Sequence, residues 1–572
     1  MAMDEEHIPA CEVGRKSGDE IDHIKSEPQE TGFSPITDSK SSEEHHDAAM
    51  EKRLSRRSRS RSQSLERSWS LNDGVSIGGN ELQDEADEAG QDADDDQGFT
   101  VRWEENDPMH PQKMSMARRW MIVLIVSCGS LCVTCTSSMY TTTYDQLMKE
   151  FKCSQEVATL GLSFFIWGLG IGPLFLSPLS EFFGRRRIYI VSFTLFLIWL
   201  IPCAVAKNIE TMLVCRFING LAGSAFLSVA GGTVGDMFDR HERGFPMMVY
   251  TASPFIGPEV GPLVGGFINE FANWRWTFYV LLIWTAVLLV SMIFLVPETY
   301  HPVLLRHKAQ KLRKETGDDR YIAPIERMHR SVAHTVLVSM YRPILLLALE
   351  PMCLCLCVFS AILLGILYLF FGAFQLIFEH VYGFSLWERG LCFMGIFVGM
   401  IIAISSDPLW RRNYMRLERK YEEKIQTENI IQPEEFQPEW RLPSAILGGP
   451  LVTIGLFMFA WTVYSHVHWI APIIGSAVFG AGVILVFTGI FTFLVDAYPT
   501  FAASALAANS FMRSSFGGIF PLFGIQMYNK LGYHWATSLL AFLTLLMLPF
   551  PYVFFQYGSR LRKKSKFATH QT

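Results

Sequence analysis

The fold is decided by one apolar stretch of the 572-residue chain, which reads SPFIGPEVGPLVGG from Ser253 to Gly266. Glycine recurs every four residues in it, and proline does so beside it, giving Gly257, Pro258, Gly261, Pro262 and Gly265. Glycines at this spacing let a neighbouring helix approach closely in a membrane. Each proline removes a backbone donor and frees a carbonyl one turn back. The stretch therefore predicts a closely packed, deformable helix that spans a bilayer.

Apolar runs of spanning length recur on both sides of this stretch. A bilayer core of about 30 Å takes roughly 20 apolar residues per helix. By that measure we expect twelve spans, at 120–142, 157–178, 188–206, 210–235, 245–268, 276–296, 351–378, 388–408, 443–464, 469–495, 502–526 and 535–556. A long polar interval after the sixth span indicates two parallel repeats with a substrate path between them. The expected fold class is an all-α membrane protein with twelve helices in two six-helix pseudo-repeats.

Five segments follow from this pattern. They are an acidic tail over 1–119, an N-terminal bundle over 120–296, a central loop over 297–350, a C-terminal bundle over 351–556 and a basic tail over 557–572. Residues 1–119 hold 28 acidic and 15 basic side chains, a net of −13, and the remainder carries +7. Such a charge-dense segment cannot bury enough apolar surface to offset the entropy of ordering, so we expect a disordered cytosolic tail.

The tail contains an alternating Arg/Ser block, followed by nine acidic residues between 81 and 97. Kinases acting on Ser58, Ser60 or Ser62 would weaken the attraction of this block to anionic membrane lipid. A solvated tail without any such role explains the same pattern. Nucleic acid is not expected as a partner, because the acidic residues lie in the same tail.

The distribution of Lys and Arg predicts the orientation in the membrane. With residue 119 in the cytosol, the connections on that side and the C-terminal tail hold 26 basic residues, and the other connections hold six. Basic residues concentrate on the cytosolic side, so both termini are expected there. The first apolar run begins near Trp120, too late for a cleavable signal peptide.

Several classes of function are disfavoured. The chain contains no Gly-Lys dipeptide, so it lacks the phosphate-binding loop of an ATP-driven pump, and it lacks the His-Glu-x-x-His motif of zinc proteases. Most of the eleven cysteines lie inside spans, where they pack as small apolar residues. We expect no enzyme activity, cofactor or metal, which leaves gradient-driven transport or facilitated diffusion of a small molecule.

Two polar groups inside predicted spans stand out. Arg216 in the fourth span costs roughly 2.5–3.5 kcal/mol to insert, so it should face a cavity or a partner unless it snorkels outward. Glu259 in the fifth span is the best candidate for a group that takes up a proton or pairs with a cation. Between the second and third spans, Glu181 could pair with the arginines that follow the turn at Gly184.

Taken together, the motifs resemble the major facilitator superfamily, and within it the fungal twelve-span drug:proton antiporters. The loop from Ser177 to Arg187 is similar to the family's Gly-x-x-x-Asp-x-x-Gly-Arg-Lys/Arg signature, with Ser177 and Glu181 replacing its first glycine and aspartate. The fourth-span Arg216-x-x-x-Gly220 and the fifth-span antiporter motif match as well. So do Asn273 to Trp276, the Pro297-Glu298-Thr299-Tyr300 segment and the glycines after Arg513.

This resemblance implies a role for each motif. It implies conformational gating by Glu181, Gly184, Arg185 and Arg186, and proton coupling through Arg216. It further implies efflux across a fungal plasma membrane, the nearest look-alikes being exporters of polyamines and multiple drugs. In the second half, Asp407 with the arginines after it resembles a degraded copy of the loop without its glycine turn.

The substrate cavity is expected between the halves, near the midplane. Its candidate lining residues are polar or aromatic side chains inside spans: Tyr140, Thr141, Asn219, Tyr368, Gln375, Asn509 and Arg513. Single amides in spans more often bond to a neighbouring helix.

The leading hypothesis is proton-coupled efflux of drugs, polyamines, secondary metabolites or other cationic or amphipathic compounds by alternating access, with proton uptake near Glu259 or Asp145. One alternative is a uniporter or importer of the same fold. Another is a transport-incompetent receptor that signals through its tail.

Overall fold

A computed structural model describes residues 99–568, apart from gaps at 105–106, 108, 240–241, 243, 328–330, 429–436, 564 and 566. Ser58, Ser60 and Ser62 lie outside the described residues, so phosphorylation there stays a prediction. The described part is built from helices, with one isolated β-bridge between Thr100 and Ile322.

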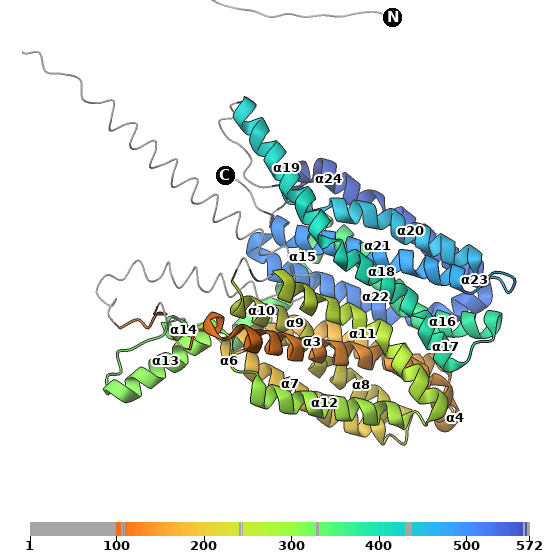
Figure 1. Ribbon diagram of the computed structural model, residues 1–572, viewed down its shortest axis with the longest axis horizontal. Helices are drawn as coiled ribbons and strands as arrows, with labels where there is room; N and C mark the ends of the chain where they lie inside the picture. The colour runs from red at the N-terminus through yellow and green to blue at the C-terminus, as the bar shows by residue number, and fades with distance from the viewer. Residues whose placement is uncertain are drawn as a thin grey trace, which may run out of the picture. The chain divides into compact units, whose positions relative to one another are not determined.

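Two groups of helices make up the bundle (Figure 1). The N-terminal half contains α3 (Met116–Met139), α4 (Tyr144–Phe151), α5 (Gln155–Ile171), α6 (Pro173–Phe183), α7 (Arg185–Ala204), α8 (Ile209–Gly223), α9 (Ala225–Ser228), α10 (Ala230–Met237), α11 (Gly244–Phe271) and α12 (Arg275–Leu295). The C-terminal half contains α16 (Pro351–Tyr382), α17 (Leu386–Cys392), α18 (Met394–Ser405), α19 (Asp407–Glu428), α20 (Pro443–Thr462), α21 (Ile470–Ala497), α22 (Ala502–Leu531), α23 (Tyr533–Met547) and α24 (Pro549–Arg562). The terminal end of the bundle is the end where α3 begins and α24 stops, and the distal end is the other.

By length and composition, ten of the described helices could cross a membrane, or eleven if the bent pair α5 and α6 counts as one span. All twelve expected spans are helical, but α11 and α22 are absent from that set. We attribute this to the prolines, glycines and polar residues that dilute their hydropathy. The set instead includes α15 (Val332–Leu349), which lies in the stretch that we expected to be a polar loop. That expectation was wrong for its last third, where Lys and Arg are sparse.

The glycines of α11 lie against α3, as their spacing predicts. A Cβ on Gly257 would collide with the hydroxyl of Thr134, and one on Gly261 with that of Ser138. A Cβ on Gly265 would lie 2.5 Å from Thr142 Oγ1. On another side of α11, the carbonyl oxygen of Pro262 would lie 2.5 Å from a Cβ on Gly390 of α17. The helix is therefore packed closely against both halves.

The two halves meet along α5 and α22 and along α11 and α17. Near the middle, Ser163 donates to the carbonyl of Gly518 at 2.6 Å, and Trp167 Nε1 donates to that of Ser515 at 3.3 Å. At the distal end, Gln526 donates to Glu156 at 2.6 Å, and Glu270 accepts from the Leu386 amide at 2.9 Å. These bonds close the distal side of the boundary between the halves.

The segment before α3 folds onto the linker between the halves. The Val101 amide donates to the Ile322 carbonyl at 3.0 Å, and Lys308 on α13 (His301–Thr316) binds Asp107 at 2.6 Å. Val101 packs in a small apolar cluster with Leu305, Ala309 and Ala323 of the linker. The expected end of the disordered tail at residue 119 was therefore too late, because α13 offers this segment both an apolar surface and a cation.

Candidate functional site

A carboxyl group is buried without a partner at the boundary between the halves. Glu259 on α11 is 0 % exposed, and neither of its side-chain oxygens has a hydrogen-bond partner among the described residues. An isolated buried carboxylate is costly, so such a group binds a proton or attracts a cation. A role for Glu259 in proton uptake or cation pairing stays a prediction, and this burial is its geometric basis.

Tyr368 on α16 connects Glu259 to the surrounding charges. Its hydroxyl lies 3.4 Å from Ser137 Oγ on α3, so it reaches across from the C-terminal half to the N-terminal half. It is also close enough to Glu259, Arg216 and Arg513 to interact electrostatically with all three. The structure therefore gathers these four predicted residues around one place in the protein.

Aromatic rings surround this group. The guanidinium of Arg513 lies over Phe491 at 5.0 Å and over Phe487 at 5.3 Å. The ring of Phe487 in turn lies 5.7 Å from that of Phe255 on α11, four residues before Glu259. An anion bordered by aromatic faces is an environment that suits an organic cation.

Arg216 points into the N-terminal half and does not snorkel outward. It is fully buried, and it donates to the carbonyls of Gly161, Thr136 and Ser137 at 3.2, 2.9 and 3.4 Å. Its guanidinium lies over the rings of Tyr140 and Phe165 at 4.4 and 4.5 Å. Backbone carbonyls and aromatic faces thus balance this charge, and they join α3, α5 and α8.

The remaining cavity candidates divide into two groups. Asn219 donates to the Phe196 carbonyl at 3.4 Å and Asn509 to Ser360 at 2.7 Å, so both bond to a neighbouring helix. The hydroxyl of Thr141 bonds within its own helical turn. Gln375 has no partner for either amide atom in the described part of the chain, which leaves it available for a ligand.

Asp145, our second candidate for proton uptake, lies in the first turn of α4 at the distal end and is exposed. Along α3 and α4 it is well beyond Ser138, which faces the turn of α11 next to Glu259. The structure therefore separates the two carboxyl groups that the sequence offered as alternatives.

The predicted gating loop joins α6 and α7. Gly184 has a φ of +92°, a conformation that favours glycine, and a Cβ on it would lie 2.7 Å from Glu298 Cδ. The Glu298 carboxylate accepts from the backbone amides of Arg185 and Arg186 at 2.9 and 3.2 Å. A carboxylate at a helix N-terminus is stabilised by the free amides and the helix dipole. Glu298 therefore caps α7.

Arg185 has an ion-pair partner that we did not expect. Its side chain is buried, and its Nε lies 3.4 Å from Asp236 at the end of α10. The ring of Tyr300 lies 4.6 Å from its guanidinium, and His301 bonds to the Asp236 carbonyl at 2.9 Å. Glu181 interacts electrostatically with Arg185 as well, so the loop forms a network and not a single pair.

Three rings connect this network to the segment before α3. The rings of Trp103, His110 and His301 lie 4.9–5.9 Å apart, at steep angles to one another. Burial lowers the pKa of His110 below its ordinary value, and the charges of His301 and Lys113 lower it further. This arrangement therefore stabilises the neutral form of His110 relative to the protonated form.

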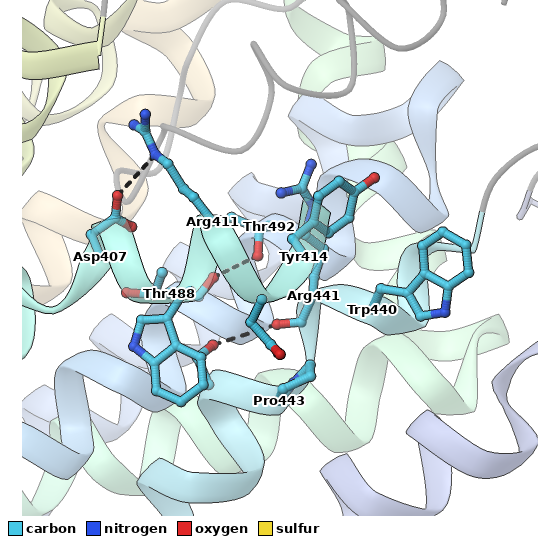
Figure 2. A pocket seen from close by; sticks show the side chains of 11 residues that line it. Asp407, Arg411, Tyr414, Trp440, Arg441, Pro443, Thr488 and Thr492 are labelled. Atoms are coloured by element: carbon cyan, nitrogen blue, oxygen red, sulfur yellow. Dashed lines mark hydrogen bonds and ion pairs between the residues drawn. The ribbon is translucent and has the colours of Figure 1, made fainter. Parts of the chain in front are cut away.

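The C-terminal half has a corresponding ion pair at its own terminal end. Arg441 Nε lies 2.8 Å from Asp496 at the end of α21, and both side chains are buried. Arg441 also lines a pocket of about 430 Å³, its open mouth included (Figure 2). The guanidinium of Arg441 lies 3.8 Å from the centre of the Tyr414 ring. Asp407 pairs with Arg411, one turn later on α19, at 3.1 Å. At the place of the glycine turn in this degraded loop copy, only Ser406 separates α18 from α19.

Four members of these networks were not predicted from the sequence: Glu298, Asp236, Asp496 and Arg441. Glu298 was visible only as part of the Pro297-to-Tyr300 segment, more than 110 residues from the amides it caps. No spacing rule relates positions so far apart. The one usable signal was the presence of an acidic residue at the end of each of these spans.

Comparisons with known proteins agree with this architecture. The family model "Major Facilitator Superfamily" matches residues 126–521. The relative "Efflux pump atB" of Aspergillus terreus is 57 % identical over 464 residues, which cover 81 % of this chain and 88 % of that protein. The "Probable drug/proton antiporter YHK8" of Saccharomyces cerevisiae is 43 % identical over 457 residues, or 80 % and 87 % of the two chains.

Among solved structures, the partially occluded inward-open xylose transporter XylE from E. coli is similar in fold. Its TM-score is 0.52 at 16 % sequence identity, and the match covers 77 % of this chain and 99 % of that one. At so low an identity the likeness concerns the arrangement of helices alone.

Proposed function

Because the chain belongs to the major facilitator superfamily, we propose that it exports small organic compounds in exchange for protons, by alternating access. The relatives named an efflux pump and a probable drug/proton antiporter support this direction and this coupling. The proposed location is the fungal plasma membrane, with the terminal end in the cytosol. That orientation agrees with the excess of Lys and Arg in the connections at this end.

The observation that carries the proposal is the unpartnered carboxyl group of Glu259 between the halves. In a site of low polarity this group is stable when it holds a proton or when a cation lies beside it. A proton and a cation compete for this carboxyl group, because protonation removes the negative charge that attracts the cation. Binding of a cationic substrate from the cytosol therefore releases the proton, and a proton arriving from outside displaces the substrate.

The substrate class follows from the surroundings of that carboxyl group. Phe255, Phe487 and Tyr368 supply aromatic faces, and Gln375 supplies an amide without a partner. These groups suit an amphipathic organic cation, a class that includes polyamine conjugates, many drugs and basic secondary metabolites.

Alternating access requires that the two sides open in turn. In this structure the distal side is closed by the bonds of Glu156 and Glu270 to the other half. The ion pairs Arg185–Asp236 and Arg441–Asp496 lie at the opposite, terminal end, one in each half. We place the gating role of Glu181, Gly184, Arg185 and Arg186 here, with Glu298 fixing the start of α7.

The test uses the full-length chain in liposomes with an imposed pH gradient and ethidium, a planar aromatic cation, as the substrate. We expect uphill ethidium movement that stops when the gradient is collapsed. Glu259→Gln keeps the size of the side chain but removes its titration, so it should abolish uphill movement while downhill exchange of bound substrate continues.

Asp145→Asn provides the matched control, because Asp145 is exposed and far from Tyr368. It should leave uphill movement within about twofold of the wild type. Uphill transport that survives a collapsed gradient would disprove proton coupling. Accumulation in the opposite direction would identify an importer, and binding without any transport would favour the receptor alternative.

A further inference from the structure

The linker helix α15 (Val332–Leu349) is long and apolar enough to cross a membrane, but its connection excludes this. Only Glu350 separates it from Pro351, the first residue of α16. Two antiparallel helices need a connection of about two residues or more. A collinear continuation would be too long, since α16 with its 32 residues already measures about 48 Å. The helix must therefore lie beside the terminal end of the bundle.

Two long faces of α15 have different surroundings. Pro343 and Leu346 are buried where the helix packs on α6 and α22. On roughly the opposite side of the helix, an apolar stripe recurs at helical spacing and is exposed, with Leu337, Tyr341 and Ile344 at 64, 61 and 58 %. Ile283 on the outer face of the span α12 is exposed to the same degree, at 63 %. The stripe thus has the character of a surface that contacts lipid.

Polar contacts attach α15 to the C-terminal half. Glu350 is buried and accepts from the Tyr498 hydroxyl at 3.2 Å and from the Phe567 amide at 3.4 Å. The guanidinium of Arg342 lies 5.6 Å from the Phe501 ring, just before α22. By contrast, α6 belongs to the N-terminal half. α15 is therefore anchored to the C-terminal half, and its contact with α6 crosses the boundary between the halves.

We propose that α15 lies in the plane of the membrane, with its exposed stripe embedded in the bilayer leaflet at the terminal end. The partner is the lipid surface, because Glu350 holds the helix within one residue of the start of a span, at the depth of the headgroups. An amphipathic helix at that depth lies with its apolar face toward the acyl chains. Arg342, which lies on a different side of the helix from Leu337 and Ile344, then faces the headgroups and water. As the halves rock, α15 moves with the C-terminal half and slides over α6.

The test places spin labels on the full-length chain in nanodiscs of phosphatidylcholine and phosphatidylglycerol. Leu337→Cys and Ile344→Cys report on the stripe, and Arg342→Cys reports on the polar flank of the same helix. Power saturation compares collisions with oxygen, which concentrates in lipid, and with a water-soluble nickel chelate. We expect the oxygen-to-nickel ratio at the stripe to exceed that at position 342 by about threefold or more.

Ile283→Cys on α12 gives the reference for lipid, and Lys314→Cys on α13 gives the reference for water. Four native cysteines are replaced by Ser in every variant: Cys11, Cys128, which is exposed, and Cys153 and Cys355, which are partly exposed. Tyr341→Cys serves as a second stripe position if one of the others misfolds.

Three results would overturn the proposal. Nickel access at the stripe equal to that of Lys314 would place the helix in water. Protection from both reagents would mean that another protein segment or a second copy of the chain covers the stripe. A depth equal to that of Ile283 would make α15 a span and invert the topology of the second half.

Discussion

A methyl group at Gly261 should separate α11 from α3. In Gly261→Ala the new Cβ would collide with Ser138 Oγ, and it would lie 3.0 Å from both the Cys135 carbonyl oxygen and the Met139 amide nitrogen. A hydroxyl can rotate away, but the backbone of a packed helix cannot. Overpacking of this kind costs about 1–3 kcal/mol.

The comparison must allow for the helix propensity of alanine, which exceeds that of glycine by about 0.8–1 kcal/mol. Gly372→Ala on α16 isolates this gain, because its Cβ would meet only the flexible Ile525 side chain, at 3.4 and 3.5 Å. We therefore expect Gly372→Ala to raise the apparent melting temperature slightly. Gly261→Ala should fall below that control by a few degrees, on the order of 2–6 °C.

The assay is thermal unfolding of the purified chain in detergent, followed by tryptophan fluorescence, with ethidium transport measured in parallel. Ser138→Ala combined with Gly261→Ala removes the hydroxyl but leaves both backbone contacts, so it should recover only a minor part of the loss. If Gly261→Ala melts at the same temperature as the Gly372→Ala control, or if Ser138→Ala restores the whole loss, then the close backbone contact of α11 and α3 does not set the stability of this pair.

Three further predictions concern other sites. Glu298→Gln weakens the cap of α7 and should lower the melting temperature by an amount equivalent to about 1 kcal/mol; an unchanged value would contradict the capping role. Arg216→Lys keeps the charge but not the three planar donor positions, so transport should fall at least tenfold while the chain stays folded; full transport would show that charge alone suffices. His110 has a lowered pKa, so docking of its segment is stable above the ordinary histidine value and weakens as the pH falls below about 6.5. Hydrogen exchange of residues 99–113, corrected for intrinsic rates, should therefore be faster at pH 5.5 than at pH 7.5, and His110→Gln should remove the difference.

The helical framework could be predicted because bilayer thickness fixes the length of a span. Each expected span is present as helix, and the glycine spacing of α11 correctly identified a closely packed face. The helices that are long and apolar enough to span a membrane are not the same set as the expected spans. α11 is too polar to qualify, because its prolines and Glu259 lower its hydropathy. α15 qualifies by its apolar composition, which carries no information about its one-residue connection to α16.

The charged networks could be predicted only in part. The turn at Gly184 follows from local sequence, since a glycine between two helices marks a tight connection. The partners of Arg185 and of the α7 amides do not, because Asp236 and Glu298 come from the ends of other spans. In the same way, nothing in the sequence distinguishes Asn219 and Asn509 from residues that line a cavity. Their amides bond to a carbonyl or a hydroxyl of a neighbouring helix, which only the structure reveals.

The prolines of α11 have a mechanical consequence. Because Pro254, Pro258 and Pro262 lack an amide hydrogen, three consecutive turns of the helix each lose one backbone hydrogen bond, yet α11 runs unbroken from Gly244 to Phe271. Flexing such a rod does not require any of those bonds to stretch, so its compliance is spread over about three turns and not concentrated at one hinge. The acid at position 259 sits in the middle of this soft section. A small movement of either half can therefore displace its carboxyl group, while the neighbouring helices α3 and α17 keep their shape.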